Sequence, residues 1–272
     1  MNFPSFESHF PDMMKFISSL TQGYRSGEIN SPEVLEKRIH TFFTAEKLAE
    51  VKAMVPPWFH IANDSDGNTL AHIMAAFISL LLCPEFLKAS KKQQELLKWI
   101  VFFHDIDKRI RKGQRDFTHG FRSAAVTGKM LPRLGFDVAP EYDGLIKDWI
   151  KSVNSAKTRQ QGKTYNVQDN RRLPEIFSGI ERLFGHNTHS ALIVETVLLH
   201  MSIDVVKDWP QTAPLTGSEM KKYIDIELCP LLKVMMLVDN DAWALFDQPT
   251  KEQYRRETLS VFKKIESVFA AD

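Results

Sequence analysis

One short stretch of the chain combines residue types that could act together on a charged ligand. A histidine is followed directly by an aspartate, His104-Asp105, at the end of an apolar run. His104 comes three and four residues after Val101 and Ile100, which predicts a position on a buried helix face. A buried carboxylate without a partner is costly, so a cation is expected beside Asp105. Lys108 would lie next to both residues on a helix, although a core histidine beside an Asp–Lys pair fits the same pattern.

A second carboxylate interrupts another apolar stripe. Every residue three or four positions from Asp239 is apolar, so its side chain is either a hydrogen-bond acceptor inside a helix bundle or a ligand. His72 and His200 are embedded in apolar segments, and His119 opens a helical segment. Imidazoles and carboxylates without thiolates suit Mn, Fe, Co, Ni or Zn. These residues are therefore candidate ligands of a divalent metal ion.

The elements that must position these residues are predicted to be helices. Ser31-Pro32-Glu33 is typical of a helix start, and Thr250 with Gln253 predicts a capping box. Apolar periodicity predicts helices over 69–87, 95–106, 119–134, 173–184, 188–206, 230–246 and 250–269, with one weak strand candidate at 163–167. The sequence thus predicts a single all-α domain over residues 1–272, built as a helical bundle.

Composition and charge exclude several classes of function. The 35 Lys and Arg residues against 34 Asp and Glu give a net charge of +1, so no bulk field favours nucleic acid or a membrane. Two cysteines without a Cys-x-x-Cys motif exclude a disulfide framework and a thiolate zinc site. The most apolar stretch, 73–82, is too short to span a bilayer, and the N-terminus resembles no signal peptide. A cytoplasmic protein that does not insert into a membrane is expected.

The order of these residues resembles the HD superfamily of metal-dependent phosphohydrolases. That family's signature is a histidine, then a His-Asp pair, then an aspartate, all on helices of one bundle. Residues 104–108 and 117–124 resemble its "HDIGK … F-x-x-H-x-x-x-S-A" run, and 237–242 resemble its last ligand segment. The resemblance covers about 68–246 and leaves an N-terminal helical extension and a C-terminal helix outside. Asp107 departs from the family, in which glycine is usual, and puts an acid beside Lys108.

The resemblance implies a phosphomonoesterase or phosphodiesterase that acts on a nucleotide or a related phosphate ester by attack of metal-bound hydroxide. It implies one or two divalent ions per chain (Mn, Fe, Co, Ni, Zn or Mg). The implied first-metal ligands are His72, His104, Asp105 and Asp239. His119 and His200 would hold a second ion, with Asp105 bridging; His186 or His189 could take the place of His200. Asp105 and Lys108 would be catalytic, and the implied substrate-binding cations are Lys108, Arg109, Arg111 and Arg122.

Two basic stretches could meet anions. One surrounds Lys108, and the other, 151–172, holds six basic residues against one acid and could be a lid, a nucleic-acid contact or a solvated loop. Two other functions fit the same residues. A di-iron oxygenase of the same superfamily would use a similar ligand set, and a non-catalytic module would bind a nucleotide or RNA. The sequence does not predict the oligomeric state.

Overall fold

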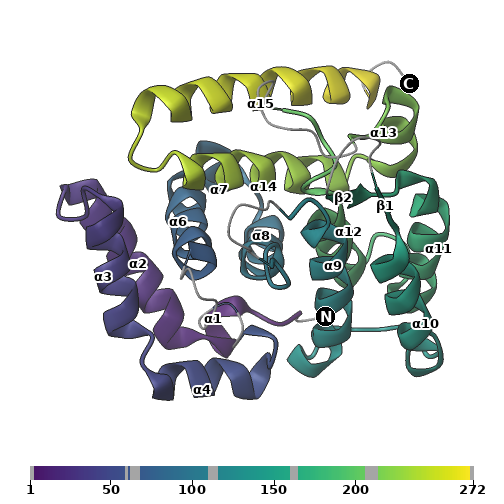
Figure 1. Cartoon of the computed structure of the whole chain (residues 1–272), viewed down its shortest axis with the longest axis horizontal. Helices are drawn as coiled ribbons and strands as arrows, with labels where there is room; N and C mark the ends of the chain where they lie inside the picture. Colours follow the sequence, from purple (N-terminus) through teal and green to yellow (C-terminus); the bar gives the residue numbers. More distant parts are fainter. Residues whose placement is uncertain are drawn as a thin grey trace.

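The computed structural model of the protein describes residues 3–58, 61, 68–109, 116–159, 165–205 and 214–269. These residues form an all-α fold with one small two-stranded sheet, which confirms the predicted fold class (Figure 1). Within the described ranges, no helix is both long and apolar enough to cross a membrane.

The helices that carry the candidate ligands pack together in the centre of the fold (Figure 1). They are α6 (Asn68–Leu82), α8 (Lys91–Phe103), α9 (His119–Met130), α12 (His189–Leu199) and α14 (Leu228–Trp243). Helix α12 contacts α8, α9 and α14, and α14 in turn contacts α6 and α8. Helix α6 is almost entirely apolar because α2, α3, α8 and α14 surround it. The buried apolar side chains form one continuous core that reaches from Phe6 to Ile265.

The remaining elements cover this central group. On one side lie α1 (Phe6–His9), α2 (Pro11–Ser26), α3 (Pro32–Phe42) and α4 (Ala45–Met54), drawn in purple and blue in Figure 1. On the other side lie α10 (Tyr142–Ser155) and α11 (Leu173–Phe184), which pack against α9 and α12 respectively. Helix α15 (Gln248–Phe269) runs along α14. The short elements are α7 (Pro84–Lys88), η1 (Leu131–Leu134), β1 (Lys157–Arg159), β2 (Asn166–Gln168), η2 (Asn170–Arg172) and α13 (Gly217–Tyr223). Strands β1 and β2 pair antiparallel.

Several predicted helix limits were wrong, and local chemistry explains them. The helix expected over 69–87 is broken at Cys83, because Pro84 lacks an N–H and starts α7 instead. The last helix begins at Gln248 rather than at Thr250. Its N-terminus is capped by Asp247, whose carboxylate accepts from the backbone N–H and the hydroxyl of Thr250.

Two further helix ends determine where candidate ligands lie. Helix α8 begins at Lys91, where Ser90 and Gln93 form a capping box, and it ends at Phe103 rather than at residue 106. Helix α12 ends at Leu199 rather than at residue 206. As a result, His104 and His200 are each the first residue after a helix, and the chain turns immediately behind them.

Close packing of α10 against α11 leads to a first prediction. A Cβ added at Gly179 would lie 2.2 Å from Cδ1 of Trp149, whose indole N–H donates to the carbonyl of Ile176 at 3.0 Å. We expect Gly179→Ala to lower the free energy of unfolding by about 1–3 kcal/mol, because the indole must move. Gly144→Ala, in open space on α10, is the matched control and should be neutral or stabilising. Equal denaturation midpoints for the two variants would contradict the tight contact.

A half-buried carboxyl on α12 leads to a second prediction. Burial, assisted by the negative charges of Asp225 and Glu181, raises the pKa of Glu195 to about 8. Between the unfolded value and that pKa, the folded chain holds a proton that the unfolded chain releases, so Glu195 lowers stability as pH rises. The stabilisation gained by Glu195→Gln should therefore grow from about pH 5 to about pH 8. Urea unfolding across this pH range measures this stabilisation, and Glu227→Gln, at an exposed position, is the control. A stabilisation that decreases as pH rises would show that folding lowers the pKa of Glu195 instead of raising it.

Candidate metal centre

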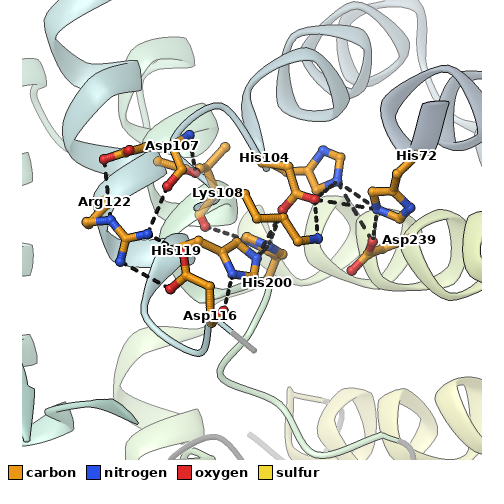
Figure 2. A network of polar contacts seen from close by, with 12 residues as sticks. His72, His104, Asp107, Lys108, Asp116, His119, Arg122, His200 and Asp239 are labelled. Carbon is orange, nitrogen blue, oxygen red and sulfur yellow. Dashed lines mark hydrogen bonds and ion pairs between the residues drawn. The ribbon is translucent and has the colours of Figure 1, made fainter. Parts of the chain in front are cut away.

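The predicted ligands come from five separate elements and meet at one place (Figure 2). His72 lies near the start of α6, His119 at the start of α9 and Asp239 near the end of α14. His104 and Asp105 follow α8, and His200 follows α12. Within the described ranges, the side chains form two groups able to hold a metal ion: His72, His104 and Asp239, and Asp105, His119 and His200.

In the first group, two imidazoles and a carboxylate face one another. Nε2 of His72 lies 2.8 Å from Oδ1 of Asp239 and 3.4 Å from Nε2 of His104. Nε2 of His104 lies 3.8 Å from the same carboxylate oxygen. The side chains of His72 and His104 are buried, whereas that of Asp239 is 17% exposed. This group is therefore the one that solvent reaches.

The second group is completely buried. Nε2 of His119 lies 3.2 Å from Nε2 of His200 and 3.0 Å from Oδ1 of Asp105. Nε2 of His200 lies 3.9 Å from that oxygen. Despite these short distances, Oδ1 of Asp105 has no hydrogen-bond partner among the described residues. The two imidazole nitrogens thus lie within hydrogen-bond distance of each other, while the carboxylate oxygen that faces them is left without a partner.

Asp105 lies between the two groups. Its Oδ1 faces the second group, while its Oδ2 is 3.6 Å from Nε2 of both His72 and His104. Oδ2 also accepts a hydrogen bond from Nζ of Lys108 at 2.6 Å. Burial by itself would raise the pKa of Asp105, but the charge of Lys108 helps hold it well below its usual value. One ionised carboxylate thus presents an oxygen to each group.

Backbone contacts determine which imidazole nitrogen is free in three of the histidines. Nδ1 of His104 donates to the carbonyl of Val101 at 2.8 Å, and Nδ1 of His200 donates to that of Val197 at 2.7 Å. Nδ1 of His119 donates to the carbonyl of Asp116 at 2.6 Å. Because a carbonyl only accepts, Nδ1 carries the proton, and in the neutral ring Nε2 presents a lone pair. Backbone-anchored imidazoles of this kind are typical of metal ligands.

The pKa values keep two of these rings neutral. Burial, together with the neighbouring His119 and His104, lowers the pKa of His200 to about 3. Burial also lowers the pKa of His104. Burial by itself would raise the pKa of Asp239, but the hydrogen bond from His72 and the favourable electrostatic interactions with His72 and His104 together hold it below the usual value. In the second group, the neutral ring of His200 presents a lone pair at Nε2 near the ionised carboxylate of Asp105, and this donor set fits a bound cation.

Lys108 is the predicted substrate-binding cation whose side chain lies at the ligands. Its Nζ contacts Asp105, and its side chain is 14% exposed. Arg109 instead extends into solvent and pairs with Asp107 at 2.9 Å. Arg111 lies outside the described residues. Asp107, the departure from the family pattern, is thus paired with a neighbouring arginine and leaves the ammonium of Lys108 on Asp105.

Arg122 is held by acids and lies away from the histidine side chains (Figure 2). Its guanidinium pairs with the carboxylates of Asp107 and Asp116 and donates to the carbonyl of Asp107 at 2.9 Å. The carbonyl of Asp116 is the acceptor for Nδ1 of His119. The geometry therefore gives Arg122 a positioning contact behind His119, whereas the sequence had predicted a substrate contact.

The structure distinguishes among the three histidines that the sequence offered as the sixth ligand. His200 belongs to the second group, while His186 is exposed and the ring of His189 packs at a tilt against Phe3, with ring centroids 4.4 Å apart. The basic stretch 151–172 is partly neutralised. Its described residues Lys151, Arg171 and Arg172 each pair with a carboxylate.

Sequence reasoning missed two residues at the site. Gln168 on β2 is fully buried; its Oε1 accepts from Ser202 at 3.0 Å, and its Nε2 has no partner among the described residues. A Cβ at Gly120 would lie 2.9 Å from that Nε2 and 3.4 Å from Cε1 of His200, so glycine permits the close approach. Trp243 stacks on His72. Its spacing of four from Asp239 was a usable signal, whereas nothing local marks Gln168.

Comparisons with known proteins identify no relative. A scan against models of protein families, a search of curated proteins and a search of solved structures each found no match.

Proposed function

We propose that this protein is a metal-dependent phosphohydrolase that acts on a nucleotide or a related phosphate ester. The observation that carries the proposal is the convergence of Nε2 of His119, Nε2 of His200 and Oδ1 of Asp105, where Oδ1 accepts no hydrogen bond from either imidazole. Divalent ions held by such ligands lower the pKa of bound water and polarise phosphoryl oxygens. The two groups have three ligands each, which supports two ions with Asp105 shared between them.

Lys108 supports phosphate as the reacting group. An ammonium has three N–H donors, and the contact with Asp105 uses one of them. The others can donate to phosphoryl oxygens and stabilise the charge that develops during transfer. Asp105 keeps Lys108 in place, so a single carboxylate orients both the ligand groups and the phosphate-binding cation.

The test is metal analysis followed by hydrolysis. Protein purified without chelators should contain up to two divalent ions per chain, and it should hydrolyse p-nitrophenyl phosphate or bis-p-nitrophenyl phosphate with Mn, Co, Ni, Zn, Fe or Mg. Treatment with a chelator should abolish this activity, and readdition of the ion should restore it. Absence of bound metal after reconstitution with each of these ions would overturn the proposal.

A di-iron oxygenase is the second candidate. Each group consists of two histidines and one carboxylate, the combination found in non-haem iron oxygenases. Anaerobic loading with Fe(II) and then exposure to O₂ separates the two candidates. Oxygen uptake and a visible absorption band would favour the oxygenase, and colourless protein with esterase activity would favour the phosphohydrolase.

A further inference from the structure

Trp243 lies beside both the ligand groups and the phosphate-binding lysine. It is the last residue of α14 and, at four positions from Asp239, shares its helix face. Its ring stacks on His72, with centroids 4.4 Å apart and planes at 28°. Nζ of Lys108 lies 5.0 Å from the centroid of the indole. The indole thus touches a candidate ligand and the cation expected to bind phosphate.

Exposure shows from which side a substrate can approach. The side chains of His72, His104, Asp105, His119 and His200 are buried. Asp239 and Lys108 are slightly exposed, and Trp243 is 49% exposed. These three residues therefore form the solvent-accessible side of the site. The other large apolar residues with exposed side chains in the described ranges are Leu87, on α7, and Ile226, between α13 and α14.

We propose that Trp243 determines specificity by packing its exposed surface against the aromatic base of a nucleotide whose phosphate contacts Lys108. The inference rests on the proposed function and names the substrate class of that site. Aromatic side chains bind bases of any identity through their π faces. In a nucleoside monophosphate only the sugar separates the phosphate from the base. A phosphate held by Lys108 therefore brings the base into the neighbourhood of the indole.

An alternative is that the indole only covers His72, and two substitutions distinguish these roles. Trp243→Leu keeps an apolar cover but removes the aromatic face, whereas Trp243→Phe keeps a smaller aromatic face. Ile226→Ala removes an exposed apolar side chain elsewhere and is the matched control. Metal content and melting temperature of every variant show whether the ligand groups and the fold survive.

The kinetic test compares adenosine monophosphate with glycerol phosphate, which has no aromatic group. We expect Trp243→Leu to lower the ratio of kcat/KM for the nucleotide to that for glycerol phosphate by about tenfold. Trp243→Phe should restore most of the ratio, and Ile226→Ala should not change it. An unchanged ratio in Trp243→Leu, with glycerol phosphate still hydrolysed, would overturn the role of Trp243 and leave the phosphohydrolase intact.

A binding measurement tests the inference without turnover. At constant metal concentration, adenosine monophosphate should quench tryptophan fluorescence in the natural protein, and this quenching should be lost in Trp243→Phe. Trp58, Trp99 and Trp149 are buried, and Trp209 lies outside the described residues, so the difference between the two proteins isolates Trp243. Quenching by the nucleotide without hydrolysis of any ester would retain the base site and reject the phosphohydrolase. Equal quenching in both proteins would reject the base site.

Discussion

Asp105→Asn should abolish both metal binding and hydrolysis. The substitution keeps the shape of the side chain but removes the charge that faces His119 through Oδ1 and His72, His104 and Lys108 through Oδ2. Without that charge, neither group keeps its full attraction for a cation, and Lys108 loses its partner. We expect hydrolysis to fall on the order of 10³-fold, the effect of removing one preorganised electrostatic contact from a transition state. Elemental analysis and initial rates with p-nitrophenyl phosphate measure the two losses.

The matched control for this variant is Asp241→Asn. Asp241 is also a buried aspartate paired with a cation, Arg255, but it belongs to neither ligand group. Burial raises its pKa, and Arg255 keeps a second carboxylate partner, Glu85, when Asp241 is replaced by the neutral amide. Metal content should therefore persist in Asp241→Asn. Full metal content in Asp105→Asn would show that Asp105 does not link the two groups.

His72→Ala and His200→Ala should each remove one of two bound ions. His72 belongs to the first group and His200 to the second, so each substitution leaves the three ligands of the other group in place, and the double variant should bind no ion. An ion present at about 1,000 times its dissociation constant stabilises the folded chain by about 4 kcal/mol. Each single variant should therefore lose roughly half of the difference in melting temperature between metal-loaded and chelator-treated protein.

Two histidines outside the groups serve as controls for metal stoichiometry. His186→Ala and His189→Ala should retain both ions, because His186 is exposed and His189 packs against Phe3. Loss of an ion in His189→Ala, with both retained in His200→Ala, would reverse the assignment of the sixth ligand. Elemental analysis of the four single variants in parallel decides between these outcomes.

Helical periodicity predicted the helices that carry the ligands, because it depends on neighbours three and four residues apart. The same local rule failed at helix ends. The apolar pattern continues past Phe103 and past Leu199, yet both helices stop there, and the rings of His104 and His200 bond to carbonyls of their own last turns. An apolar residue can follow the last residue of a helix in a turn as well as in a further helical turn. Apolar periodicity therefore did not reveal where these two helices end.

For the charged residues near the site, too, local spacing predicted some contacts and not others. The spacing of Lys108 from Asp105 predicted their contact, which the structure contains. The basic neighbours Arg109 and Arg122 suggested phosphate binding, but they pair with Asp107 and Asp116. The acid partners were visible in the sequence, but which cation each acid would bind was not.

The sequence by itself determined the helical class of the protein and the types of its candidate ligands. Both depend on residue chemistry and on spacing within single helices. Tertiary structure alone decided that residues as distant as His72 and Asp239 lie 2.8 Å apart, that Asp105 faces two groups and that Gln168 lies near His200. It also decided that Trp243 is half exposed at the accessible side of the site. Such contacts arise from the packing of helices far apart in the chain, which no local pattern encodes.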